Sequence, residues 1–186
     1  MEFNETYIPG LFLFQPKVFE DSRGYFFESY NKEVFSAAGF KNDWQQDNES
    51  YSAYGVIRGL HFQNPPKAQA KLVRVLEGSI YDVAVDIRKG SPTFGQWFGV
   101  ELSAENKSQL FIPAGFAHGF SVLSPFAKVL YKCDNLYDKN SEGGIMYNDA
   151  DLNIDWKIPV DKRIISKKDL ENPALKQINI HFTYEA

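Results

Sequence analysis

The chain has 186 residues, of which 44% are hydrophobic and 24% charged, and its formal net charge is −4. This composition is typical of a globular protein and excludes a disordered chain, a collagen and a coiled coil. The acidic balance without a basic stripe argues against a general nucleic-acid binder, and no apolar run approaches the roughly 20 residues that span a bilayer. We therefore expect a single domain over residues 1–186, with neither nucleic acid nor a membrane as its partner.

Two features bear on where the protein works. The first five residues include two glutamates and lack the basic and apolar regions of a signal peptide. Cys133 is the single cysteine, which excludes an intrachain disulfide and a cysteine-rich metal site. Both features predict a cytoplasmic protein.

Short aromatic and β-branched runs alternate with Gly, Pro, Asn and Asp turns along the chain. This pattern predicts an all-β sandwich or barrel. In chain order, strands are expected at Leu11–Phe14, Tyr25–Tyr30, Val56–Phe62, Lys71–Leu76, Ser79–Arg88, Gln96–Leu102, Leu110–Ile112, Gly119–Leu123 and Lys128–Cys133. The segment from about residue 157 has weaker strand signals, and we expect it to wrap the core or to join a partner.

A few short helices are also expected. Asn31 is a suitable N-cap for a helix that ends at Gly39, because asparagine side chains cap helix starts and glycine adopts the left-handed conformation at helix ends. A second short helix is predicted near Lys168–Leu170.

The clearest strand is Ser79–Arg88, in which Tyr81 and Val83 begin an apolar series that alternates with Asp82 and Asp86. Because side chains alternate across a strand, one face should be buried and the other wet or paired.

Two polar residues lie on apolar strand faces. Lys71 shares its face with Val73 and Val75. A buried ammonium is unfavourable unless it is paired or functional, so Lys71 either has a role or reaches water at the mouth of the strand. Tyr131 is either a core tyrosine whose hydroxyl binds a carbonyl or a phenol that projects into a lumen as a proton donor.

Two of the three histidines, His61 and His118, lie in apolar strand contexts. A lone histidine in such a strand is more often structural than catalytic, but the presence of two favours a functional role somewhat more. Arg58 and His61 have opposite parity on a regular strand. A bulge at Gly59 would turn both toward the same side.

The segment Pro113-x-Gly115-x-x-His118 resembles the second motif of the cupins, a family of small jelly-roll barrels. The first cupin motif supplies a His-x-His pair, but here the matching place reads His61-Phe62-Gln63. Since a metal triad needs two histidines and a carboxylate, the missing histidine argues against a metal site.

A longer ordered set of segments resembles the dTDP-4-dehydrorhamnose 3,5-epimerase family, within a cupin-type jelly roll, from about Ile8 to about Asn172. The segments are Asp21-Ser22-Arg23-Gly24-Tyr25-Phe26-Phe27-Glu28, Gln46-Asp47-Asn48, Arg58-Gly59-Leu60-His61-Phe62-Gln63, Lys71-Leu72-Val73-Arg74-Val75, Tyr131-Lys132-Cys133 and Ser166-Lys167-Lys168-Asp169.

The resemblance implies an isomerase that converts dTDP-4-dehydro-6-deoxy-D-glucose to dTDP-4-dehydro-L-rhamnose without a cofactor or a metal. In such an enzyme, His61 would be the base and Tyr131 the acid on the opposite face of the sugar. Asp169 would orient His61, and Lys71 would stabilise the enolate oxygen. The sequence alone favours a plainer interpretation, in which Asp169 caps a helix N-terminus or lies on the surface.

The resemblance further implies a set of substrate contacts: Arg23, Phe26, Glu28, Gln46, Asn48, Arg58, His118, Tyr137, Glu142 and Lys168. Tyr137 would stack on the thymine ring, with an exposed loop aromatic as the alternative. Either Lys167 or Lys168 would reach the ligand, and Asp47 has no evident direction. The resemblance also implies a homodimer in which residues near the N-terminus complete the partner's site.

Three other functions fit parts of this pattern. They are an epimerase that inverts one centre only, a sugar-nucleotide-binding module without catalysis, and a metal-dependent cupin enzyme. An intact set of His61, Lys71, Tyr131 and Asp169 argues against the binding module, and the single first-motif histidine argues against the metalloenzyme.

Overall fold

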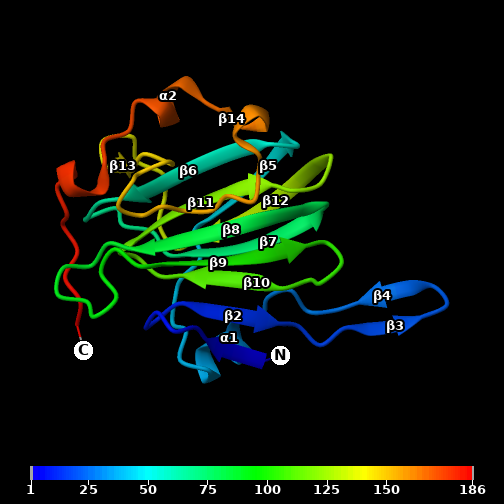
Figure 1. Ribbon diagram of the computed structural model, residues 1–186. Coiled ribbons are helices and arrows are strands. Elements are labelled where there is room, and N and C mark those ends of the chain that lie inside the picture. The colour runs from blue at the N-terminus through cyan, green and yellow to red at the C-terminus, as the bar shows by residue number, and fades with distance from the viewer. Residues whose placement is uncertain (1, 186) are drawn as a thin grey trace.

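The computed structural model describes residues 2–185 and consists of two β-sheets packed face to face, with a hairpin that projects from them (Figure 1). The first sheet has the order β1 (Glu2–Glu5), β2 (Phe12–Gln15), β10 (Gln109–Ile112), β7 (Lys71–Glu77), β12 (Phe126–Cys133) and β5 (Gln46–Ala53). The second has the order β13 (Glu142–Gly144), β6 (Val56–Gln63), β11 (Phe116–Val122), β8 (Ser79–Asp86) and β9 (Trp97–Ser103), with β14 (Ile164–Ile165) parallel to β6.

This architecture confirms the all-β, cupin-type prediction. Short helices α1 (Lys32–Ala37) and α2 (Lys167–Leu170) and two 3₁₀ turns, at Val160–Lys162 and Leu175–Gln177, complete the described chain. The side chain of Asn31 accepts hydrogen bonds from the first turn of α1, and Gly39 has a φ of +98°, as the capping pattern predicts.

Every predicted strand overlaps an observed one, although the strand predicted over Tyr25–Tyr30 ends at Phe26. The sequence pattern did not reveal β1, β3 (Phe19–Asp21), β5, β13 or β14. Of these, β5 matters most, because it lies beside β12 and supplies one wall of the cleft described below.

An apolar core fills the space between the sheets. Val73 and Val75 of β7 and Val129 of β12 pack there against Ile80 and Phe120 from the second sheet. Lys71 lies on the same face as the two valines, at the first residue of β7, and is half-buried. The interior therefore changes from apolar to polar along the strands of the first sheet.

The outer face of the second sheet is also buried. Val83 and Val85 of β8 pack against Leu152, Ile154 and Trp156 from the C-terminal part of the chain, whose path across this sheet is visible in Figure 1. Strand β8 thus has two buried faces, not one buried and one wet. The prediction that the acids of this strand are either wet or paired is confirmed in its second form, because Asp82 pairs with His118 and Asp86 with Arg88 on the inner face.

On the outer face of the first sheet, α1 places Phe35 against Phe14 in an edge-to-face contact with ring centroids 4.8 Å apart. Phe111 of β10 and Phe40 extend this aromatic cluster. The outer face of the first sheet is therefore covered over β2, β10 and β7, whereas its outer face over β12 and β5 stays open to solvent.

Strands β6 and β11 approach each other closely at two glycines. His118 pairs with His61 and Phe120 with Arg58, so β6 holds one extra residue, a bulge at the place where the sequence allows one. Gly59 has a φ of +124°, and a Cβ there would lie 2.5 Å from the Cα of Gly119. Only glycine fits at this position.

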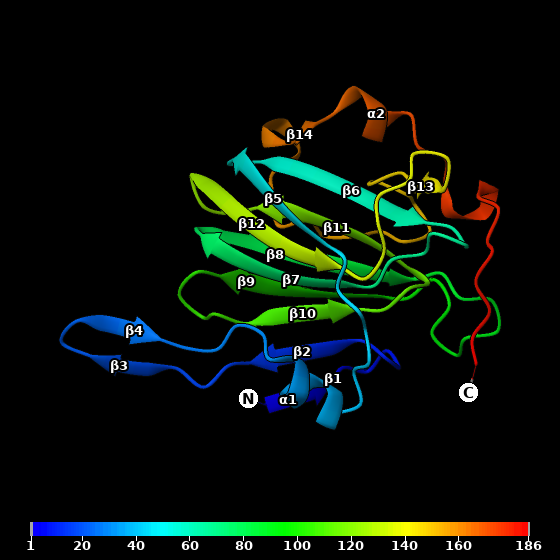
Figure 2. The same cartoon turned by 180° about the vertical axis from the view of Figure 1, so that it is seen from behind.

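The hairpin of β3 and β4 (Gly24–Phe26) projects away from both sheets (Figure 2). It carries three large apolar side chains, Phe19, Tyr25 and Phe26, which are 54%, 59% and 67% exposed. Within residues 2–185, no helix has the length and apolar character to cross a membrane.

The close approach at Gly59 predicts that Gly59→Ala destabilises the protein by more than about 3 kcal/mol, because a clash with β11 adds to the strain of a positive φ. Gly39→Ala is the matched control, since its φ is also positive but nothing lies within 4 Å of its added Cβ. We expect about 1–2 kcal/mol there. Urea unfolding of both variants measures the difference, and equal losses would show that β6 and β11 separate easily.

Candidate active site

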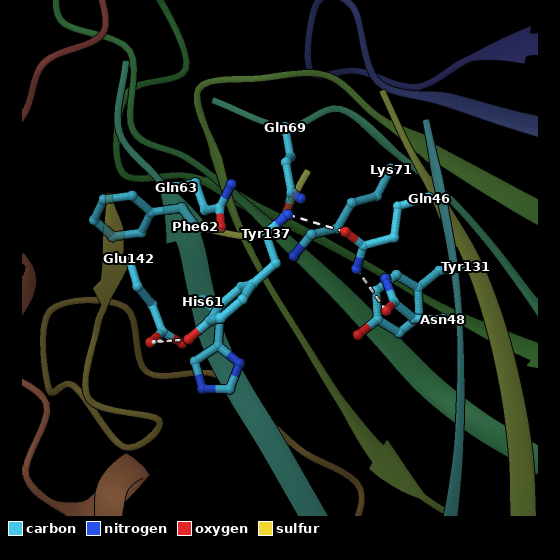
Figure 3. A pocket seen from close by; sticks show the side chains of 10 residues that line it. All are labelled: Gln46, Asn48, His61, Phe62, Gln63, Gln69, Lys71, Tyr131, Tyr137 and Glu142. Carbon is cyan, nitrogen blue, oxygen red and sulfur yellow. Dashed lines mark hydrogen bonds between the residues drawn. The ribbon is translucent and has the colours of Figure 1, made fainter. Parts of the chain in front are cut away.

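A cleft between the two sheets collects most of the polar residues that the sequence singles out. It consists of two depressions of about 270 and 200 Å³, and His61, Lys71 and Tyr131 line both. In Figure 3, His61 and Glu142 lie on one side, Lys71, Tyr131, Gln46 and Asn48 on the other, and Tyr137 between them. The first group belongs to the second sheet and the other four residues to the first sheet.

His61 forms a partly buried pair with Asp169. Its Nε2 lies 2.6 Å from the Asp169 Oδ1, and the exposed fractions of the two side chains are 33% and 5%. Burial alone would raise the pKa of Asp169, but the hydrogen bonds from His61 and the Gly59 amide outweigh it and lower this pKa. The Asp169 carboxylate thus stays ionised and orients the ring, while Ser166 caps α2 through the Asp169 amide. Asp169 is neither a surface acid nor the helix cap.

A second histidine pair lies deeper in the same interior. His118 Nε2 lies 2.7 Å from Asp82 Oδ1, and both side chains are buried. Burial lowers the pKa of His118, although Asp82 opposes the shift, so the ring is neutral near pH 7. The second oxygen of Asp82 is buried without a hydrogen-bond partner in the described structure.

Lys71 and Tyr131 point into the cleft from neighbouring strands β7 and β12. Neither side chain has a hydrogen bond or ion pair to another residue within 2–185. Burial lowers the pKa of Lys71, an effect opposed by electrostatic interactions with Cys133, Asp82 and Glu142, and burial raises the pKa of Tyr131. The phenol therefore keeps its proton and can donate it.

Glu142 connects helix α2 and the Tyr137 loop at the rim of the cleft. It accepts a 2.6 Å bond from Lys168 Nζ and a 3.2 Å bond from the Tyr137 hydroxyl. Burial would raise the pKa of Glu142, but these two bonds lower it. Of the two adjacent lysines, Lys168 is the one that binds a residue lining the cleft, Glu142.

Strand β5 supplies the wall beside Tyr131. Gln46 donates to Asn48 Oδ1 at 2.8 Å, and both line the cleft. Asp47 points outward and pairs with Lys132, which settles its direction. Arg58 lines the cleft with His61, as the bulge requires, and donates to Ser52 Oγ at 2.9 Å.

Three predicted contact residues are not brought to the cleft within this chain. Arg23 lies on the hairpin, 88% exposed, and pairs with Asp21 at 2.6 Å. Phe26 lies on the same hairpin, and Glu28 is exposed and accepts a bond from Asn31. Their roles stay predictions that depend on a second chain.

Several residues that line the cleft or support it were not predicted from the sequence. Gln69 and Ser50 line it, Gln63 lies at its base, and Asp82 binds His118 behind it. Strand parity could have indicated Gln63, which is two residues from His61, and Ser50, which is two from Asn48.

The residues present do not fit the metal of metal-dependent cupins. Within residues 2–185, no group of three His, Cys, Asp or Glu side chains is arranged to hold a metal ion. His61 and His118 already use Nε2 for a carboxylate, and the Gln63 amide makes three hydrogen bonds to the backbone.

His61 can act as a base and Tyr131 as an acid from facing sheets, with the Lys71 ammonium beside the tyrosine. This arrangement can remove a proton from one face of a flat intermediate and return a proton to the other face.

Comparison with known proteins agrees with this chemistry. The sequence model of the family described as dTDP-4-dehydrorhamnose 3,5-epimerase matches residues 5–177. The dTDP-4-dehydrorhamnose 3,5-epimerase of Shigella flexneri is 56% identical over 89% of this chain and 91% of its own.

Two solved structures have the same fold over almost the whole chain. That of dTDP-4-dehydrorhamnose 3,5-epimerase from Elizabethkingia anophelis has a TM-score of 0.91 and 54% identity over 95% of this chain and 97% of its own. That of dTDP-6-deoxy-D-glucose-3,5-epimerase from Legionella pneumophila, in complex with dTDP-4-keto-L-rhamnose, has a TM-score of 0.95 and 46% identity over 100% and 99%.

The buried His118 predicts a pH dependence of stability. Its pKa is lowered in the folded chain and is about 6.5 in the unfolded chain, so protonation favours unfolding. Stability should be greatest above about pH 6.5 and should fall as the pH drops below it, by up to about 1.4 kcal/mol per pH unit. The lowered pKa of Asp169 acts only in a lower window, below about pH 4.

Urea unfolding at several pH values tests this, with His118→Gln as the comparison. The variant should be less stable at pH 7.5, because Asp82 loses its partner, yet its stability should fall less between pH 6.5 and pH 5. Parallel curves for the two proteins would assign the acid sensitivity to other groups.

Proposed function

The chain belongs to the dTDP-4-dehydrorhamnose 3,5-epimerase family, and we infer that it converts dTDP-4-dehydro-6-deoxy-D-glucose to dTDP-4-dehydro-L-rhamnose by inverting C3 and C5. One observation supports this most strongly: His61 and Tyr131 lie on opposite sheets and line the same cleft, with Lys71 beside the tyrosine. The reaction is redox-neutral, and its proton transfers need only side chains.

The substrate's ketone at C4 makes the hydrogens on C3 and C5 acidic, because the carbanion is stabilised as an enolate. We propose that His61 removes each proton. Its Nε2 donates to Asp169, which leaves Nδ1 as the nitrogen that accepts the substrate proton. The ionised Asp169 then stabilises the imidazolium, as the carboxylate does in a catalytic triad.

Lys71 would bind the oxygen on C4 as negative charge develops there. An ammonium surrounded by protein interacts more strongly with that oxygen than one in water, because the local dielectric constant is lower. Tyr131, with its raised pKa, would return a proton to the face opposite His61. Removal from one face and return to the other is the condition for inversion.

The remaining residues would bind the nucleotide. Arg58 and Lys168 carry charges that match a diphosphate, and Tyr137 is exposed enough to stack on the base. Gln46, Asn48, His118 and Glu142 would contact the sugar or the base through hydrogen bonds.

We also propose a homodimer in which the β3–β4 hairpin of one chain completes the cleft of the other. The hairpin projects from its own sheets, exposes three aromatic side chains and carries Arg23 and Phe26. A detached pair of strands with exposed apolar residues is stable only marginally unless it packs on another surface.

A cytoplasmic location is a further part of the proposal. The buried Cys133 thiol supports it, since a single unpaired cysteine is typical of proteins in reducing compartments.

Proton exchange tests the assignment of the base. In heavy water, with the 4-keto-6-deoxyglucose nucleotide and no added metal or nicotinamide, we expect deuterium at both C3 and C5 by NMR. His61→Asn should slow both exchanges by about 10²–10⁴-fold, because a positioned general base is lost. Binding of dTDP should persist in this variant, and normal exchange in it would remove His61 from the mechanism.

Tyr131→Phe is the second arm of the same experiment. It should retain deuterium exchange, because the base is intact, but form less inverted product, most visibly at C5. An unchanged product ratio would contradict the acid role, and wild-type exchange at one carbon alone would indicate a single-centre epimerase.

Subunit mixing tests the hairpin. Arg23→Ala should lower kcat/KM at least about tenfold, because we propose that the Arg23 guanidinium binds the diphosphate of the substrate in the partner's cleft, and that bond is lost. His61→Asn disables the cleft but leaves the hairpin intact. If the hairpin completes the partner's cleft, a purified heterodimer of the two variants holds one intact site, formed by the cleft of the Arg23→Ala chain and the hairpin of the His61→Asn chain. This heterodimer should recover about half of the wild-type activity. A heterodimer no more active than the mean of its parents would contradict the proposal.

A further inference from the structure

Gln63 occupies a distinctive place at the end of β6. It is two residues from His61, where metal-dependent cupins carry a second histidine, and it is only 5% exposed. Its Nε2 donates to the carbonyls of Lys67 at 2.6 Å and Leu136 at 3.2 Å, and its Oε1 accepts from the amide of Asp138 at 2.8 Å. Both of its donor hydrogens and its carbonyl oxygen are therefore used on the backbone.

Two of these backbone groups flank Tyr137. The side chains of Leu136 and Tyr137 are 53% and 56% exposed, so apolar packing does not hold this loop. The amide of Tyr137 itself donates to Gln46 Oε1 at 2.9 Å. Two glutamines, one from each sheet, thus fix three consecutive positions of the loop.

The main chain of Gln63 also constrains the far end of the tyrosine. In the ladder between β6 and β13, Gln63 is the partner of Glu142. Glu142 accepts the hydrogen bond of the Tyr137 hydroxyl. Gln63 is therefore connected to the backbone on both sides of Tyr137 and to the residue that binds its phenol.

We propose that Gln63 is a positioning residue that fixes Tyr137 for stacking on the base of the nucleoside diphosphate. The inference rests on the proposed function, in which Tyr137 stacks on that base. Removing the Gln63 side chain leaves the Leu136 carbonyl and the Asp138 amide unpaired and frees the loop to sample other conformations. Nucleotide binding must then order the loop, which lowers affinity.

A double-mutant cycle tests this, with the Kd of dTDP measured by calorimetry. Tyr137→Ala should raise Kd by about tenfold, since stacking of a base on an aromatic ring contributes about 1–3 kcal/mol. Gln63→Ala should raise Kd by about fivefold in the native background and by less than about twofold when Tyr137 is already alanine. In the epimerase assay, KM for the sugar nucleotide should rise in Gln63→Ala while kcat stays within about twofold.

Ser121→Ala is the matched control, because it removes a buried 2.6 Å bond from a side chain to a carbonyl, that of Trp156, away from the cleft. It should lower stability without changing the Kd of dTDP. If Gln63→Ala does not fold, Gln63→Met keeps the volume and removes all three bonds.

The outcomes distinguish the stacking role of Tyr137 from the positioning role of Gln63. A Tyr137→Ala variant that binds dTDP normally would show that the stacking role is wrong. A weakened Tyr137→Ala variant, together with a Gln63→Ala effect that is absent or equally large in both backgrounds, would overturn the inference about Gln63 alone.

Discussion

The contact between β6 and β11 determines which side chains reach the cleft. Gly59 and Gly119 allow the two backbones to lie closer than any Cβ would permit, and the bulge at this point adds one residue to β6. Because of that residue, Arg58 and His61 face the same cleft, whereas a regular strand would place them on opposite sides. The Gly59 amide also lies 3.4 Å from Asp169 Oδ2, so the bulge supports the carboxylate that orients His61. The backbone geometry at Gly59 therefore decides which side chains are available for chemistry in the cleft.

Hydrophobic periodicity predicted the strands that carry at least one apolar face of several residues, such as β7 and β8, and failed for β5. Strand β5 has polar residues on both faces, because Gln46 and Asn48 line the cleft while Asp47 faces solvent beside Lys132. No apolar face remains to mark it as a strand. In β8 the alternation was correct, but both faces are buried, since residues distant in sequence cover the outer one. The pattern reveals where side chains alternate, and only the tertiary structure reveals what covers them.

The sequence likewise predicted some residues of the candidate site and gave no sign of how others pair. Lys71 and Tyr131 were conspicuous as polar groups on apolar strand faces, and parity placed them correctly on an interior face. The pairing of His61 with Asp169 spans 108 residues and leaves no trace in spacing, so only the family resemblance indicated it. The sequence placed Asp82 on one face of an alternating strand but predicted no role for it. Its contact with His118 depends on the register of β8 against β11, which a single sequence does not specify.

The long separation between His61 and Asp169 has a consequence for how the enzyme comes into being on the ribosome. Translation adds about 5–20 residues per second, so the codon for Asp169 is read roughly 5–20 seconds after that for His61. During that interval β6 to β13 have been synthesised, and His61, Lys71 and Tyr131 are already in the chain. A product terminated after β13 would carry the histidine without the carboxylate that sets its tautomer. With His61 as the base that we propose, proton abstraction should be efficient only in chains translated beyond α2, because shorter chains lack the carboxylate that pairs with this histidine.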